Sequence, residues 1–294
     1  MKITRMNGPF GAIVEDFDIA SQTNDETMRQ LIAALYEHQI LAIRGQQDMS
    51  DADYLRFGQY WGKPLKFFIT SHVKNDHPEI IRIGNDPKTP ERLRDGAMHW
   101  HSDSSYEPIP AAVTMLRGIE TPTVGGETHV ASNRLAYEAL DAETKARVDG
   151  ATALHCLGGS PELPGEKIPL HPASIALNGI QKHPLVIRHP VTGTKALFPS
   201  GTAFGIDSEE DREESRELIG RLRAHATQPQ FVTTYKVMPG DVFIWDNFQT
   251  MHTATALKYS DADGERRMIH RISTKGIPAA CSAHPEGHYP LPPA

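Results

Sequence analysis

The sequence predicts a mostly β protein with additional helices, built on a sandwich or jelly roll (a double-stranded β-helix) with helices on its flanks. Many short apolar runs of strand length follow one another along the chain. Turn signals separate these runs, among them Gly125-Gly126, Thr192-Gly193, Pro239-Gly240-Asp241 and Asp263-Gly264. Helical spacing is confined to a few segments, which are expected to decorate this sandwich or jelly roll.

The strand-like runs begin with residues 10–14 and the short apolar run at 40–43, which is typical of a buried strand. Further strands are predicted at residues 79–83, 112–117, 128–131, 185–189, 195–198, 231–237, 242–245 and 268–273.

Four helices are predicted. Residues 25–38 place Met28, Leu31, Ile32 and Leu35 at helical spacing. Ser50 precedes a second helix as its N-cap, and this helix extends towards position 61. The other two helices are expected at about 133–148 and, with a charged sequence, at about 208–226.

The chain of 294 residues is interpreted as one domain with a large buried core. Residues 157–182 are rich in Pro and Gly and lack periodicity, which predicts a lid over a site. Residues 281–294 are Pro-rich and are expected to form an extended tail.

Composition excludes several classes of function. A net charge of −7 argues against a nucleic-acid partner, because no dominant basic surface can neutralise phosphates. Two cysteines, Cys156 and Cys281, cannot form a disulfide framework or a paired metal site. The sequence contains no apolar run of membrane-span length and no signal-peptide pattern at its start. We therefore expect a soluble cytoplasmic protein that does not bind membranes.

The most informative residues are His101, Asp103 and His252. Two histidines and one carboxylate can hold Fe(II) on one face and leave the opposite positions open for oxygen and a co-substrate. Side chains two apart on a strand share a face, so His101 and Asp103 can reach one ion. His252 lies 149 residues beyond Asp103, and a jelly roll would return it by pairing early and late strands. This ligand set predicts oxidation chemistry with dioxygen.

Other interpretations of these histidines exist. Among 15 histidines and 37 acidic residues, about two His-x-Asp/Glu tripeptides are expected by chance, and three occur. The pairs at His77 and His284 contain Pro and are typical of loops. His99 is a rival ligand on the face of His101, although His101 has the more useful spacing to Asp103. His252 could equally be a core histidine.

Five ordered motifs resemble one known family. Trp100-His101-Ser102-Asp103-Ser104-Ser105-Tyr106 is similar to the proximal ligand motif of the TauD/TfdA family, named for taurine dioxygenase and 2,4-dichlorophenoxyacetate dioxygenase. The similarity continues at residues 125–128, 189–198, 245–247 and 266–271. Together these motifs cover most of the chain from about residue 40 to 276.

The resemblance implies a role for each matching residue. His101, Asp103 and His252 would bind Fe(II), and Thr128 and Arg267 would hold the distal carboxylate of 2-oxoglutarate, the co-substrate used with O2. A buried dicarboxylate needs a fixed bidentate donor, which Arg supplies better than Lys. The reaction would hydroxylate a substrate and release succinate and carbon dioxide. Family members are often dimers or tetramers, so a homo-oligomer is expected.

The substrate is expected to be a small organic anion. Arg271 lies four residues after Arg267, so on a strand both guanidinium groups point to the same face. By resemblance, Arg271 would bind the anionic group of a carboxylate, sulfonate or sulfate ester. Phe204 and Phe68 would line the pocket, and the apolar run at residues 67–69 fits an aryl or alkyl acid better than taurine.

One departure from the family pattern and two other classes of function remain open. The spacing of 15 residues between His252 and Arg267 is longer than expected, which indicates an extended turn at residues 260–264. A zinc hydrolase could use the same three ligands with an activated water. A cupin-like binding module could share the jelly roll without turnover. The hydrolase would not need Thr128 and Arg267 beside the metal, and the three intact ligands argue against a module without turnover.

Overall fold

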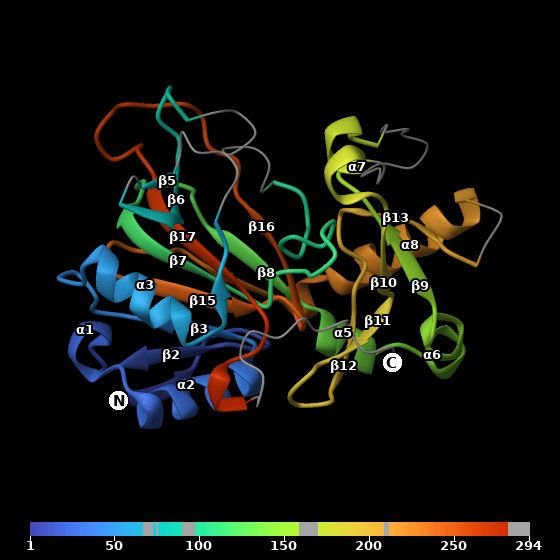
Figure 1. Cartoon of the computed structure of the whole chain (residues 1–294), viewed down its shortest axis with the longest axis horizontal. Coiled ribbons are helices and arrows are strands. Elements are labelled where there is room, and N and C mark those ends of the chain that lie inside the picture. Colours follow the sequence, from blue (N-terminus) through green and yellow to red (C-terminus); the bar gives the residue numbers. More distant parts are fainter. Residues whose placement is uncertain (67–72, 75, 90–97, 159–169, 209–211, 282–294) are drawn as a thin grey trace.

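The computed structural model describes residues 1–66, 73–74, 76–89, 98–158, 170–208 and 212–281 (Figure 1). Its largest element is a mostly antiparallel sheet in which only β2 and β3 pair in parallel. The spatial order of its strands is β1 (Lys2–Arg5), β2 (Ala12–Glu15), β3 (Ile40–Ile43), β15 (Val242–Asp246), β7 (Val113–Glu120), β17 (Met268–Lys275), β6 (His77–Gly84) and β5 (Val73–Lys74), with β4 (Lys63–Pro64) paired to β17.

A second, smaller sheet faces the interior side of the large one. It contains β14 (Val232–Tyr235), β8 (Thr128–Ser132) and β16 (Thr250–Ala254), in that order. Val130 of this sheet packs in one buried cluster with Phe243, Trp245 and Ile269 of the large sheet. Two facing sheets of this kind form the core of a double-stranded β-helix, so the predicted fold class is confirmed.

Two helices cover the outer face of the large sheet (Figure 1). They are α2 (Asp25–His38) and α3 (Asp51–Gln59), and α1 (Ile19–Gln22) lies beside α3. Leu31 and Leu35 of α2, together with Tyr54 and Phe57 of α3, belong to the buried cluster that includes Ile272 of β17. Each helix buries one apolar face against the sheet, so its apolar residues recur at helical spacing. This pattern is why the sequence identified both helices.

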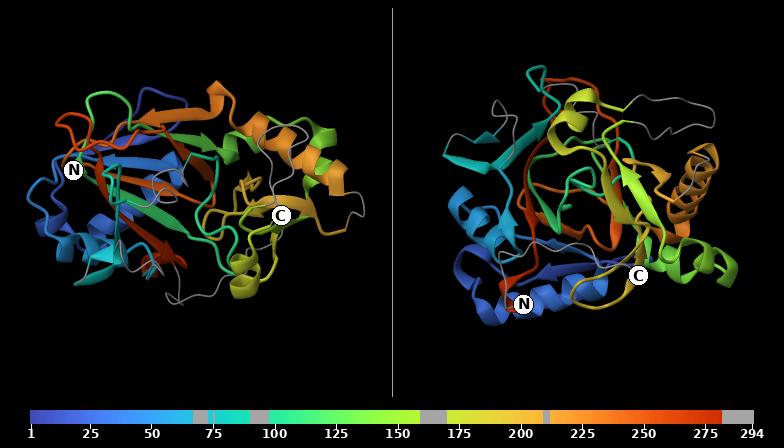
Figure 2. Two further views of the ribbon diagram at one scale, coloured as in Figure 1. Left: turned by 90° about the horizontal axis from the view of Figure 1, so that it is seen from above. Right: turned by 45° about the vertical axis from the view of Figure 1, so that its right-hand side comes forward.

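The remaining elements form a second lobe beside the sandwich (Figure 2). This lobe contains α5 (Asn133–Glu138), α6 (Ala142–Val148), β9 (Thr152–His155), α7 (Pro172–Asn178), β10 (Gln181–Pro184), β11 (Val186–Arg188), β12 (Lys195–Leu197), β13 (Ala203–Ile206), α8 (Arg212–Ala226) and the 3-10 turn η2 (Pro229–Phe231). The 3-10 turn η3 (Ala279–Cys281) lies outside this lobe, after β17. Strands β10, β9 and β13 form a small sheet, and β11 and β12 form a hairpin. Leu218, Ile219 and Leu222 of α8 are buried in the core of the lobe.

Several predicted boundaries are wrong. The single helix expected at 133–148 is two helices, because the Asp141 carboxylate accepts the N–H of Thr144 (2.7 Å) and starts a new helix there. The expected lid contains a regular element, α7, although residues 159–169 of that segment lie outside the described part of the chain. The expected tail lies outside the described residues from 282 onwards.

Within the described residues, no helix combines the length and the apolar character that a membrane span requires. Both cysteines are free thiols, with Cys156 buried and Cys281 exposed.

The tight turn between β14 and β15 depends on Gly118 of β7. A Cβ atom at position 118 would lie 2.1 Å from the backbone oxygen of Met238, and backbone atoms cannot move aside cheaply. We expect Gly118→Ala to lower the free energy of unfolding by about 1–3 kcal/mol, as measured by urea titration. Gly220→Ala is the matched control, because Gly220 is an exposed position of α8 with open space around it. It should stabilise by about 0.5–1 kcal/mol. Equal effects of the two substitutions would contradict this packing argument.

Candidate metal centre

Two backbone hydrogen bonds bring His101 next to His252. The N–H of His101 donates to the carbonyl of His252 (3.0 Å), and the N–H of His252 donates to the carbonyl of His101 (2.8 Å). The two residues form an isolated antiparallel bridge at the edge strand β16. The predicted meeting of early and late segments is therefore confirmed. Their imidazole rings lie 4.2 Å apart between centroids.

Asp103 completes the cluster from a turn rather than from the expected strand. The chain leaves the bridge at once, and Ser104 adopts a left-handed backbone conformation (φ 55°). Asp103 Oδ1 lies 3.8 Å from His101 Nε2, and Oδ2 lies 3.8 Å from His252 Nε2. One ligand atom from each residue lies within 4.8 Å of the other two. The three side chains could therefore hold a single ion after small side-chain adjustments.

The tautomer of His101 suits a metal ligand. Its Nδ1 lies 2.6 Å from the carbonyl oxygen of His99, which can only accept a hydrogen bond. The proton therefore resides on Nδ1, and the lone pair of Nε2 is left for a metal ion. His99 contributes this backbone oxygen, while its own side chain is exposed and stands outside the cluster.

The electrostatics of the site keep both ligand types in their metal-binding forms. Burial lowers the pKa of His252 to about 3, and His101 adds to this effect, so the imidazole is neutral at physiological pH. Burial alone would raise the pKa of Asp103, but His252, Arg271 and His101 outweigh it and lower the pKa to about 2. A neutral imidazole and an ionised carboxylate are the states that coordinate metals.

Thr128 lies on the same face of the small sheet as His252. In the pairing of β8 with β16, Val130 lies opposite His252 and Thr128 lies opposite Ala254, so Thr128 and His252 share a face. The Thr128 hydroxyl is buried and has no hydrogen-bond partner among the described residues. An unsatisfied buried hydroxyl is costly, which makes it a candidate contact for a ligand.

Arg267 immediately precedes β17 and lies four residues before Arg271. Burial lowers the pKa of its guanidinium to about 10, which still leaves it charged at neutral pH. No acidic side chain among the described residues pairs with it. A Cβ atom at Gly126 would lie 3.7 Å from Cδ of Arg267, so this arginine passes close to the segment that leads into Thr128. Thr128 and Arg267 are therefore a polar group and a cation available to an anionic ligand.

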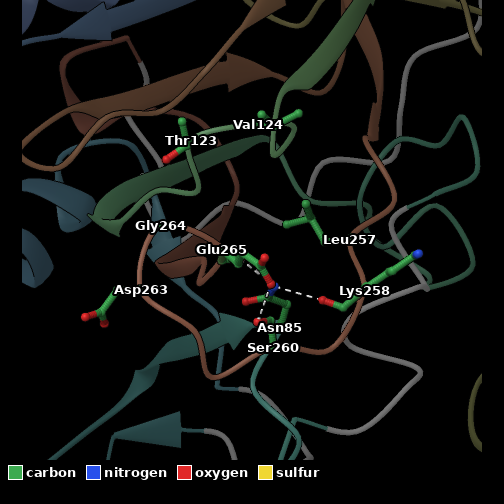
Figure 3. Close-up of a pocket in the computed structure, with 9 residues that line it drawn as sticks. All are labelled: Asn85, Thr123, Val124, Leu257, Lys258, Ser260, Asp263, Gly264 and Glu265. Atoms are coloured by element: carbon green, nitrogen blue, oxygen red, sulfur yellow. Dashed lines mark hydrogen bonds between the residues drawn. The ribbon is translucent and has the colours of Figure 1, made fainter.

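Asn85 fixes the segment that carries Arg267, and sequence reasoning missed this residue. Its Oδ1 accepts the N–H of Arg267 (2.7 Å), and its Nδ2 donates to the carbonyls of Lys258 and Glu265 (both 2.9 Å). Figure 3 shows Asn85 beneath the long loop between β16 and β17. The loop borders a cavity of about 470 Å³ that contains none of the predicted site residues. The longer spacing between His252 and Arg267 is thus accommodated in a loop anchored at Asn85.

The three predicted substrate residues have different surroundings. Arg271 of β17 lies in the site, with Nη1 3.5 Å from Oδ1 of Asp103. Phe204 of β13 is buried in a small apolar cluster with Leu154, Cys156 and Leu170. Phe68 lies outside the described residues. The structure therefore brings Arg271 to the candidate metal centre and places Phe204 in the second lobe.

The fold and the cluster define a double-stranded β-helix with a His-x-Asp and distal His centre. Residues 2–273 match the family described as "Taurine catabolism dioxygenase TauD, TfdA family". The chain belongs to this family of dioxygenases, which are oxidoreductases. The resemblance stated from the motifs is therefore confirmed.

Individual relatives span almost the whole chain. The (S)-phenoxypropionate/alpha-ketoglutarate-dioxygenase of Sphingobium herbicidovorans is 30% identical and covers 96% of this chain and 97% of its own length. The alkylsulfatase of Acinetobacter baylyi is 28% identical, over 94% of this chain and 85% of its own. Among solved structures, AAD-2 in complex with Mn(II) and N-oxalylglycine superposes with a TM-score of 0.79 at 28% identity, over 94% of this chain and 98% of that chain.

The unsatisfied hydroxyl of Thr128 leads to a stability prediction. Thr128→Val removes a buried polar group without removing a hydrogen bond, so it should leave the free energy of unfolding unchanged or raise it by up to about 1 kcal/mol. Thr233→Val is the matched control, because the buried Thr233 hydroxyl donates to the carbonyl of Phe10 (2.9 Å). This control should lose about 1 kcal/mol in the same urea titration. A loss of similar size in Thr128→Val would show that its hydroxyl is satisfied within the protein.

Proposed function

We propose that this protein is an Fe(II)- and 2-oxoglutarate-dependent dioxygenase that hydroxylates a small anionic organic substrate, with His101, Asp103 and His252 as the iron ligands. The observation that carries the proposal is the convergence of these three side chains on one point, with the unsatisfied Thr128 hydroxyl on the face of His252. Arg267, which pairs with no acidic side chain among the described residues, adds a cation four residues before Arg271. Family membership supports the reaction class.

The donor set fits ferrous iron. Two neutral imidazoles and one carboxylate on one side of an ion are typical of non-haem Fe(II) oxygenases, because the opposite positions stay open. Once bound, Fe(II) and 2-oxoglutarate supply the activation of O2, with succinate and carbon dioxide as the products of the co-substrate. Asp103 contributes the anionic ligand, since its pKa of about 2 keeps it ionised at any physiological pH.

Arg267 and Thr128 would bind the distal carboxylate of 2-oxoglutarate. A guanidinium presents paired N–H donors that match a carboxylate, and the hydroxyl of Thr128 can donate a further hydrogen bond. Arg267 is partly buried, and the reduced hydration that lowers the pKa of its guanidinium also strengthens its attraction for an anion. Asn85 would orient this arginine through its backbone.

Arg271 would bind the anionic group of the substrate. It lies beside Asp103 and is the second cation on the interior face of the β17 segment. Relatives named for phenoxypropionate, 2,4-dichlorophenoxyacetate and alkyl sulfates support an aryloxy or alkyl carboxylate or a sulfate ester. We keep Phe204 and Phe68 as proposed apolar contacts of such a substrate.

Two other functions would use the same fold. A zinc hydrolase would need the three metal ligands and a water, but it would not need a buried hydroxyl and a second cation. A binding module without turnover would need neither an ionised Asp103 nor a neutral His252. The experiments below give different results for each of these functions.

The first test is an anaerobic titration with Fe(II) and 2-oxoglutarate. We expect the weak visible charge-transfer band of the iron–2-oxoglutarate chelate in the wild-type protein. His101→Ala should abolish the band because it removes an iron ligand. Arg267→Ala should abolish or greatly weaken it at moderate 2-oxoglutarate concentration, because the distal carboxylate loses its cation. Thr128→Val should weaken 2-oxoglutarate binding without loss of stability.

Bound iron without any band in the wild type would exclude the dioxygenase proposal and favour zinc hydrolysis. Thr233→Val serves as the folded control, because its side chain contacts Phe10 rather than the site.

The substrate class is tested with Arg271→Ala. We expect this variant to keep the charge-transfer band but to lose most hydroxylation of aryloxy and alkyl acids or sulfate esters, with KM rising about 10-fold or more because a charged hydrogen bond is worth roughly 1.5–3 kcal/mol. Product formation is measured by mass spectrometry beside succinate release. Unchanged KM values across a panel of anionic substrates would remove Arg271 from the proposed site.

Four further expectations stay predictions. They are a single domain over residues 1–294, closure of the segment 157–182 over the site, a homo-oligomeric state (dimer or tetramer), and a cytoplasmic location without nucleic-acid or membrane partners. Light scattering after size-exclusion chromatography measures the oligomeric state.

A further inference from the structure

We infer that Asn247 and Thr114 are positioning residues that set the geometry of the metal centre, with Asn247 connected to both Asp103 and His252. This inference rests on the proposed role of His101, Asp103 and His252 as metal ligands. In this arrangement Asn247 and Thr114 would not contact the ion, and each would act through a ligand.

Asn247 has only one amide orientation that satisfies its neighbours. Its Oδ1 lies 3.1 Å from the backbone N–H of Asp103 and 3.2 Å from Nε1–H of Trp245, and both groups can only donate. The oxygen must therefore face these two donors. The Nδ2 group consequently points at Thr114 Oγ1, 3.1 Å away, and donates to it.

This orientation determines where the proton of Thr114 goes. The Thr114 hydroxyl accepts from Asn247, and its single proton is directed to Oδ2 of Asp103, 2.6 Å away. Ser273 Oγ, 3.0 Å from the same hydroxyl, is a second acceptor for this proton, but the carboxylate oxygen is nearer and charged and therefore takes it. The hydrogen bond occupies Oδ2 of Asp103, whereas Oδ1 makes a longer contact with Arg271 Nη1 (3.5 Å) and would be the ligand oxygen. The carboxylate is thus held for coordination through one oxygen.

The second connection runs to His252 through Trp245. The Trp245 indole is fixed at one end by its hydrogen bond to Asn247. Its ring packs on the imidazole of His252 with 4.4 Å between centroids. The packing restricts rotation of the imidazole, whose Nδ1 has no hydrogen-bond partner among the described residues. Asn247 therefore orients two of the three ligands, which come from segments 149 residues apart.

Burial strengthens this network. Thr114 is fully buried, Asn247 is 1% exposed and Asp103 is 6% exposed, so water cannot replace the lost hydrogen bonds. Partners of metal ligands that are held in this way typically change metal affinity by about 10–100-fold when they are removed.

The test measures the binding of Fe(II) alone by anaerobic equilibrium dialysis, without 2-oxoglutarate and without turnover. Thr114→Val keeps the shape of the side chain but removes the donor to Asp103, so the Kd for Fe(II) should rise about 10–100-fold. Thr114→Ser restores the donor and should recover most of the affinity. Thr233→Val makes the same chemical change at a buried site of β14, two strands from His252, where the hydroxyl donates to Phe10, and it should leave the Kd unchanged.

Asn247→Asp provides a second, independent variant. It keeps the acceptor for the N–H groups of Asp103 and Trp245, but it presents a carboxylate to Thr114. The Thr114 proton then turns away from Asp103, and the Kd for Fe(II) should rise as it does in Thr114→Val. Thermal unfolding of each metal-free variant shows whether it is folded.

The outcomes separate the inference from the proposed function. Wild-type affinity for Fe(II) in folded Thr114→Val, or failure of Thr114→Ser to recover it, would overturn the inference and leave the dioxygenase proposal intact. A wild-type protein that does not bind Fe(II) would overturn both.

Discussion

The candidate site depends on the two hydrogen bonds that join His101 to His252. They attach the loop containing His101 and Asp103 to the outer edge of the small sheet, where β16 has no other strand partner among the described elements. An edge strand offers unpaired N–H and C=O groups, and here a loop uses them for a single bridge. The bridge fixes the distance between two segments that are far apart in the chain. It thereby brings His101 and Asp103 close to His252.

The loop is also held from the second lobe. The N–H of Ser102 donates to Ser200 Oγ (3.1 Å), and Ser105 Oγ lies within hydrogen-bond distance of Ser200 and Thr202. Thr202 in turn contacts the buried His155. Because the lobe and the sandwich both bind the loop, its left-handed Ser104 can be maintained next to Asp103. The second lobe is therefore part of the support of the site.

The Trp245-Asp246-Asn247 motif shows how one short segment serves several purposes. Trp245 packs on His252, and Asn247 receives the N–H of Asp103. Asp246 Oδ2 lies 3.0 Å from Nε2 of the fully buried His189, which joins the hairpin β11–β12 to the sandwich. Three consecutive side chains thus connect the large sheet, the ligand loop and the second lobe. The motif therefore helps to identify the site from the sequence, although none of its members is a proposed metal ligand.

The sequence by itself determined the fold class, the two amphipathic helices α2 and α3, the candidate ligands and the family, because periodicity and short motifs are local properties. It did not determine β16, since Thr250–Ala254 carries His252 on its buried face where an apolar residue would be expected. The roles of Asn85 and Thr114 could not be predicted from the sequence either, because each contacts a residue more than ten positions away. Only tertiary structure decides such contacts: polar side chains become specific when burial removes water and leaves one set of partners.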